Sequence, residues 1–219
     1  RKAYAAAMSH MDDGIGQVLK SLKDQNLLNN TIILFISDNG AQQKWLPSEE
    51  LYDGKYGPNL TLGSNLPLRD YKTSNYEGAI RVPAIISWKN HLDPGESENY
   101  IQVTDWMPTF LKWAGATQTP ITIEGEAAQA LLSLKLIDRS NPIYIRGHLQ
   151  ECLIKKPYKL IRTRRLEGEP SYALYDIEKD PSETNNLSTS NTEKLKELQD
   201  LLNTEFSKDT PEVNVELRD

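Results

Sequence analysis

The sequence predicts an α/β fold that is followed by a small antiparallel β-sheet with a final helix. Two observations lead to this prediction. A helical pattern over residues 4–28 runs directly into an apolar strand at residues 31–37, the alternation typical of α/β domains. Three short strand-like segments then follow one another after residue 140, separated by polar turns, which indicates an antiparallel meander. We therefore expect a larger domain at residues 1–140 and a small α+β subdomain at residues 141–219.

The first element is an amphipathic helix over residues 4–28. Its apolar residues recur at intervals of three and four, which places them on one face. These residues are Tyr4, Met8, Met11, Ile15, Val18, Leu19 and Leu22. The pair Asn29-Asn30 ends the pattern just before the strand.

The strand at residues 31–37 ends in the sequence Ser37-Asp38-Asn39-Gly40. Its apolar run has no alternation, so we expect a strand covered on both faces. Open α/β sheets bind ligands at the carboxyl edge, and carboxylate and amide oxygens suit Ca²⁺ or Mg²⁺. Asp38 and Asn39 are therefore candidate metal ligands. Asn-Gly is also a strong hairpin signal, but residues 42–47 do not supply the alternating second strand that a hairpin needs.

The middle of the chain alternates loops with short elements. Residues 40–66 form a long glycine-bearing loop without periodicity, and such a loop beside a sheet edge is usually functional. A second buried strand is predicted at residues 81–88 and a turn region at residues 90–99. A short helix then begins at Thr104 or Asp105 and ends at Gly115.

In the last hundred residues a linker and a series of short strands replace the helix–strand alternation of the N-terminal part. A linker with a short helix at residues 127–136 precedes three strands, at residues 142–149, 158–163 and 172–177. A final amphipathic helix covers residues 192–206, and the polar tail after Lys208 is expected to be loose.

Composition excludes some functions. The 38% hydrophobic and 26% charged residues are typical of a globular protein, and the net charge of −6 argues against a nucleic-acid binder. A local basic cluster at residues 155–165 is interpreted as a solvated strand face, with contact to an anionic polymer as the alternative.

The single cysteine, Cys152, excludes an internal disulfide and is expected to be buried in a strand. No segment has the roughly 18 to 20 apolar residues that a membrane span requires.

Five motifs, in order along nearly the whole chain, resemble those of the sulfatases in the alkaline phosphatase superfamily. They are the helix motif at residues 10–16, the Ser-Asp-Asn-Gly signature at 37–40, the lysine-bearing segment at 68–72 with Glu-Gly-x-x-Arg-Val-Pro at 77–83, Thr-Asp-x-x-Pro-Thr at 104–109, and the C-terminal signature at 174–187. The resemblance implies an alkaline-phosphatase-like α/β sandwich, of which residues 1–140 form the C-terminal portion.

The resemblance also implies roles for individual residues. Asp38 and Asn39 would bind one divalent cation, Ca²⁺ with Mg²⁺ as the alternative. Lys72 would be the catalytic residue that stabilises charge developing on the ester oxygens, and the ion would act as Lewis acid and template. Without the resemblance, composition alone would favour the alternative interpretation of Lys72 as a solvated loop residue. Glu77 and Arg81, four residues apart, are interpreted as a structural ion pair.

The chain departs from the family pattern at the nucleophile. Sulfatases use a formylglycine made from Cys or Ser within Cys/Ser-x-Pro/Ala-x-Arg, and the sequence around Cys152 lacks the proline and the arginine. The paired aspartates that complete the metal shell lie near the N terminus of the family and are also missing here. Asp12 and Asp13 do not replace them, because they lie mid-helix, where neighbouring residues point about 100° apart, and are interpreted as a solvated helix face. The chain thus resembles the C-terminal half of a sulfatase, with the formylglycine expected in the missing N-terminal half. We expect no turnover from this polypeptide alone. At residues 124–127 the linker looks shorter than in the family.

Three functional hypotheses follow. The first is an arylsulfatase-like sulfuric ester hydrolase, with sulfated carbohydrate as one substrate class and the N-terminal half of the same domain as partner. The second is a phosphate or phosphonate ester hydrolase of the same superfamily. The third is a catalytically silent domain that binds metal or a partner chain. By family resemblance the protein would be secreted, lysosomal or periplasmic.

Overall fold

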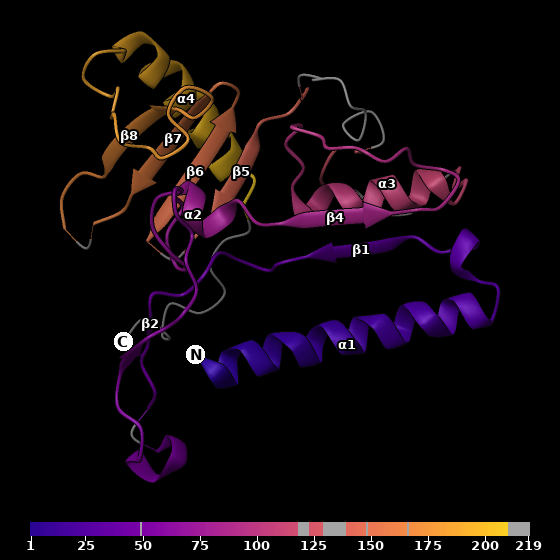
Figure 1. Cartoon of the computed structure of the whole chain (residues 1–219). Coiled ribbons are helices and arrows are strands. Elements are labelled where there is room, and N and C mark those ends of the chain that lie inside the picture. Colours follow the sequence, from indigo (N-terminus) through magenta and orange to yellow (C-terminus); the bar gives the residue numbers. More distant parts are fainter. Residues whose placement is uncertain (49, 118–122, 129–138, 148, 166, 210–219) are drawn as a thin grey trace. The chain divides into compact units, whose positions relative to one another are not determined.

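The structure is a computed structural model and describes residues 1–48, 50–117, 123–128, 139–147, 149–165 and 167–209 (Figure 1). The chain forms two compact units, Arg1–Gly95 and Glu96–Asp219. These units are defined by internal contacts alone, so the predicted domain division at residue 140 stays a prediction. The predicted helix at residues 127–136 falls largely outside the described residues.

The first unit begins with the predicted amphipathic helix. Its elements in chain order are α1 Lys2–Asp24, η1 Leu28–Asn30, β1 Ile33–Ile36, β2 Lys44–Trp45, η2 Leu51–Gly54, β3 Asn59–Leu60, α2 Glu77–Ile80 and β4 Ala84–Ser87. Helix α1 ends four residues earlier than predicted, because Asn26 adopts a left-handed conformation with φ of 59°. Asp12 and Asp13 are exposed on α1, as a solvated helix face requires. No helix in the described ranges is both long and apolar enough to cross a membrane.

Strands β1 and β4 form a two-stranded antiparallel sheet, with Ile33 opposite Ser87 and Ile36 opposite Ala84. The prediction that these strands are covered on both faces is wrong for this unit. Phe35 is 40% exposed and Ile85 is 65% exposed. An apolar run predicts a strand, but burial depends on which elements pack against both of its faces. Pairing of β1 with β4 also excludes the hairpin alternative at Asn39-Gly40.

The predicted loop at residues 40–66 contains a small hairpin. Strands β2 and β3 pair antiparallel, with Lys44 opposite Leu60 and Trp45 opposite Asn59. We refer to residues 42–62 as the arm. Figure 1 shows it as a narrow loop that carries the label β2.

The second unit contains a four-stranded antiparallel meander. Its elements are η3 Val103–Asp105, α3 Trp106–Trp113, β5 Ile143–Arg146, β6 Gln150–Lys155, β7 Tyr158–Thr163, β8 Ser171–Asp176 and α4 Thr192–Phe206, and the sheet order is β5-β6-β7-β8. Sequence analysis predicted ranges for three of these strands and none for β6, although it placed Cys152 in a strand. The predicted first strand was extended through Gly147, which instead lies in the turn that closes with a hydrogen bond from Gly147 N to Gln150 O. Cys152 is fully buried in β6, which confirms its predicted environment.

The core of this unit lies between the sheet and α4. Leu153 of β6, Leu160 of β7 and Leu174 of β8 pack with Leu198 and Leu202 from the helix, and all five are fully buried. Asn191 caps α4, because its side-chain oxygen accepts a hydrogen bond from Lys194 N. The leucine spacing of the sequence therefore predicted the correct buried face of this helix.

The interpretation of the basic cluster at residues 155–165 as a solvated face is only partly correct. Lys159 is fully buried and its Nζ lies 2.9 Å from Glu183 Oε1. Arg162 and Arg164 both form ion pairs with the buried carboxylate of Glu151. The acidic partners are distant in sequence or on the neighbouring strand, so the local charge pattern did not reveal them.

The motif Thr104–Thr109 forms a buried polar network around Asp105. The Asp105 carboxylate accepts hydrogen bonds from Gln102 N and Glu126 N, both at 2.8 Å, and forms a two-point ion pair with Arg139. Gly125 has φ of 94° and approaches so closely that an added Cβ would lie 2.4 Å from Thr104 O. Gly125, Glu126 and Arg139 are thus fixed to the start of α3 by backbone and side-chain contacts.

We predict that Asp105→Ala lowers the free energy of unfolding by about 3 to 5 kcal/mol, because Arg139 would lose its buried partner. Urea unfolding of the chain, followed by circular dichroism, measures this change. The exposed Asp93→Ala variant is the matched control and should change stability by less than about 0.5 kcal/mol. Equal stability of the two variants would contradict a structural role for Asp105.

Candidate active site at the end of β1

The turn Ser37–Gly40 follows β1 and is held by three hydrogen bonds. Ser37 N donates to Pro83 O at 3.2 Å, Ser37 Oγ donates to Asn39 O at 2.9 Å, and Gly40 N donates to Ala79 O at 2.8 Å. Within this turn the Asp38 side chain is exposed and Asn39 is half-buried. The backbone is therefore fixed while a carboxylate remains accessible to a ligand.

The turn packs against α2 through two glycines. A Cβ added to Gly40 would lie 1.8 Å from Gly78 O, and a Cβ added to Gly78 would lie 2.4 Å from Arg69 O. Gly78 N also donates to Arg69 O at 2.8 Å. Only glycine fits at either position, so close backbone packing explains the presence of glycine in both motifs.

A backbone hydrogen bond holds Lys72 beside the turn Ser37–Gly40. Lys72 N donates to Ala41 O at 2.9 Å, two residues after Asn39. Asp70 and Thr73 have positive φ angles of 68° and 85°, so the chain turns sharply on both sides of Lys72. The Lys72 side chain is exposed. That the side chains of Asp38, Asn39 and Lys72 face one pocket stays a prediction.

Asn65 is a structural residue of this site that sequence analysis missed. Its Oδ1 accepts from Ala41 N at 2.8 Å, and its Nδ2 donates to Asp70 O at 2.8 Å and to Ala41 O at 3.3 Å. One side chain thus joins the turn after β1 to the segment that carries Lys72. The available signal was an asparagine within a glycine- and proline-bearing loop, where its amide replaces backbone partners.

Glu77 and Arg81 form the predicted ion pair, with Arg81 Nη1 3.9 Å from Glu77 Oε2. Glu77 is buried at the start of α2, whereas Arg81 is largely exposed. Arg69 stacks over the ring of Tyr76 at 4.1 Å from the ring centroid. These contacts stiffen the segment between Arg69 and Arg81.

The donor set of the turn suits a hard divalent cation. Asp38 offers carboxylate oxygens and Asn39 offers an amide oxygen, the ligand types of Ca²⁺ and Mg²⁺. Across the described part of the chain, no cluster of three or more His, Cys, Asp or Glu side chains is arranged to hold a metal. The two residues fit such an ion as part of a larger ligand set.

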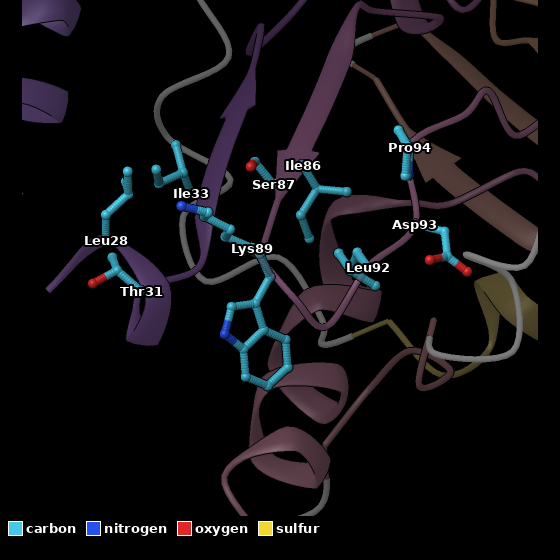
Figure 2. A pocket seen from close by; sticks show the side chains of 10 residues that line it. Leu28, Thr31, Ile33, Ile86, Ser87, Lys89, Leu92, Asp93 and Pro94 are labelled. Carbon is cyan, nitrogen blue, oxygen red and sulfur yellow. The ribbon is translucent and has the colours of Figure 1, made fainter. Parts of the chain in front are cut away.

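A cavity of about 320 Å³ lies at the other end of the β1–β4 pair (Figure 2). Figure 2 shows it between Leu28 and Ile33 on one side and Ile86 and Leu92 on the other. Its ten lining residues include none of Asp38, Asn39 and Lys72. The lining is mostly apolar, so this cavity lacks the paired oxygen donors of the turn.

The comparison with known protein families decides the family. The model of the sulfatase family matches residues 1–116, and the model described as N-sulphoglucosamine sulphohydrolase, C-terminal, matches residues 70–211. The chain belongs to the sulfatase family.

Curated relatives agree with this assignment. N-acetylgalactosamine-6-sulfatase from Homo sapiens is 33% identical over 151 residues, covering 67% of this chain and 26% of that protein. Steryl-sulfatase from Rattus norvegicus is 38% identical over 134 residues, covering 59% of this chain and 22% of that protein. This sulfatase chain therefore spans about a quarter of the length of these two relatives.

Solved structures share the fold. The crystal structure of Ps i-CgsB in complex with k-i-k-neocarrahexaose is 26% identical and has a TM-score of 0.71, covering 93% of this chain and 42% of that chain. BT4656 in complex with its substrate D-glucosamine-2-N,6-O-disulfate is 25% identical with a TM-score of 0.65, covering 90% of this chain and 38% of that one. The similarity confirms the predicted α/β fold class and the resemblance to the C-terminal part of a sulfatase domain.

We predict opposite effects for two glycine-to-alanine changes. Gly40→Ala should lower the free energy of unfolding by about 1 to 3 kcal/mol, because the new Cβ overlaps the backbone of Gly78. Gly16→Ala, in the exposed middle of α1 with no atom within 4 Å, should raise it by about 0.5 to 1 kcal/mol. Denaturant unfolding of both variants measures the difference, and a neutral Gly40→Ala would contradict the close approach.

Proposed function

We propose that the complete protein containing this chain hydrolyses sulfate esters, and that this chain supplies part of the active site. The observation that carries the proposal is the hydrogen bond from Lys72 N to Ala41 O, which places the lysine segment beside the Asp38–Asn39 turn. Membership of the sulfatase family supports the reaction type.

Asp38 and Asn39 would hold one divalent cation through their side-chain oxygens. Ca²⁺ takes six to eight oxygen ligands, so these residues contribute only part of its shell. When bound, the cation supplies Lewis-acid polarisation of a sulfate oxygen and orients the ester. The hydrogen bonds of Ser37 and Gly40 would keep the turn from moving when it binds the ion.

Lys72 would stabilise negative charge on the sulfate oxygens. Its ammonium is a compact charge with three donors, and its backbone is fixed to the turn that would hold the cation. Because fixed donors cost little reorganisation during reaction, they lower the barrier of transfer reactions effectively.

The nucleophile would come from outside this chain. Cys152, the single cysteine, is fully buried in β6 and cannot reach a substrate there. We propose a formylglycine in the remaining part of the domain, so residues 1–219 alone would show no turnover. The ligands bound in two structural neighbours, a carrageenan-type hexaose and a disulfated glucosamine, support sulfated carbohydrate as substrate class.

We predict that Lys72→Ala in the complete protein lowers kcat for 4-nitrophenyl sulfate about 100-fold or more, because one charge-stabilising donor is lost. The same variant should bind Ca²⁺ as the wild type does in isothermal titration calorimetry. The exposed Lys23→Ala on α1 is the control and should leave both quantities unchanged. An unchanged kcat for Lys72→Ala would remove this residue from the reaction.

We predict that Asp38→Ala weakens Ca²⁺ binding at least about tenfold, because a charged ligand is removed from the shell. Calorimetry on the metal-free protein measures the affinity, and Asp93→Ala serves as the control. Unaltered affinity and activity in Asp38→Ala would refute the metal assignment. Preferential turnover of 4-nitrophenyl phosphate by the wild type would instead identify a phosphate ester hydrolase.

A further inference from the structure

The arm, residues 42–62, has no role in the chemistry proposed above. It begins directly after the Asp38–Ala41 turn and returns at Asn65, seven positions before Lys72. One end of the arm therefore adjoins the turn proposed to hold the cation, and the other leads to the segment that carries Lys72.

The base of the arm is fixed to the Lys72 segment. Ala41 N donates to Asn65 Oδ1, and Ala41 O accepts from Asn65 Nδ2 and from Lys72 N, the latter at 2.9 Å. A Cβ added to Gly63 would lie 2.6 Å from the Ala41 Cβ, so the returning strand lies directly against the leaving one. The base of the arm therefore has a defined position beside the Lys72 segment.

The arm exposes more large apolar side chains than it buries. Its two strands have two residues each, too short to form a core of their own. Among its described side chains the large exposed ones are Leu46, Leu51, Tyr56, Leu60 and Leu62, with Leu60 at 70% and Tyr56 at 51% exposure. Exposed apolar groups gathered on one segment are typical of a binding surface.

Cationic side chains accompany the aromatic ones on the arm. Lys55 Nζ lies 5.5 Å from the centroid of the Tyr56 ring, and both residues are exposed. Lys44 is likewise exposed and precedes Trp45 on β2. An aromatic face packs against the C–H face of a sugar ring, and an ammonium beside it pairs with a sulfate group.

We propose that the arm binds the sugar residues that flank the scissile sulfate ester, with Tyr56 stacking on a sugar ring and Lys55 contacting a second sulfate. This inference rests on the proposed function and adds the determinant of substrate choice. The arm would discriminate among sulfated oligosaccharides because its contacts lie beside, and not at, the reacting group. A small aryl sulfate would reach Lys72 without touching the arm.

The test compares two substrates on the complete protein. We expect Tyr56→Ala and Lys55→Ala to lower kcat/KM for a sulfated oligosaccharide, a κ-carrageenan or heparin hexasaccharide, about tenfold. The same variants should change kcat/KM for 4-nitrophenyl sulfate by less than about twofold. Tyr56→Phe and Lys55→Arg keep the ring and the charge, so they should retain most of the oligosaccharide activity. Lys20→Ala on α1 is the exposed-lysine control.

Binding separates this inference from the proposed function. If the wild type hydrolysed no sulfate ester, the proposed function would fail, yet oligosaccharide affinity that falls in Tyr56→Ala would still support the arm. Equal losses on both substrates would make the arm a structural support of the site and overturn the inference. So would unaltered kinetics and affinity in both alanine variants. A dimer that dissociates on Tyr56→Ala, measured by light scattering, would identify the arm as an interface between copies and overturn it as well.

Discussion

The close approach of two glycine backbones, Gly40 and Gly78, is the constraint on which the candidate site depends. The space between them excludes even a single Cβ, because an added methyl at Gly40 would lie 1.8 Å from Gly78 O. Hydrogen bonds from Gly40 N to Ala79 O and from Gly78 N to Arg69 O then join the end of β1, the lysine-bearing segment and α2. Asp38 and Lys72, two of the proposed site residues, are exposed, but the backbone beneath them is fixed.

Charged residues fall into two classes in this chain. Asp105 and Glu151 are buried and have arginine partners, and Lys159 is buried beside Glu183. Burial of a charge is tolerated only with such partners, so removing one member of these pairs would destabilise the second unit. Asp38 and Lys72 are instead exposed on a rigid backbone. Exposed charges on fixed backbone remain available to an ion or a substrate, which is the arrangement expected of a binding site.

Local patterns predicted some elements better than others. The helical spacing of leucines identified the buried face of α4, and the apolar run identified β1. The bounds of β5 and β6 were not predicted, because the turn at Gly147 lies within the segment 142–149 that reads as one continuous strand. The burial of β1 was overestimated, since an apolar run records what a strand tolerates and not which neighbours cover it. For the same reason, the acidic partners of the basic cluster were invisible in the local sequence.

Short motifs in a fixed order along the chain predicted the resemblance to sulfatases, the α/β fold class and the candidate residues Asp38, Asn39 and Lys72, because each motif can be recognised from neighbouring residue types. Only the tertiary structure showed that Asn65 joins the turn to the lysine segment, that Gly125 packs on Thr104, and that the loop after Ala41 is a hairpin with exposed aromatic and cationic residues. These contacts join residues far apart in the sequence. Their geometry follows from how backbones approach in space, which no local pattern of residue types encodes.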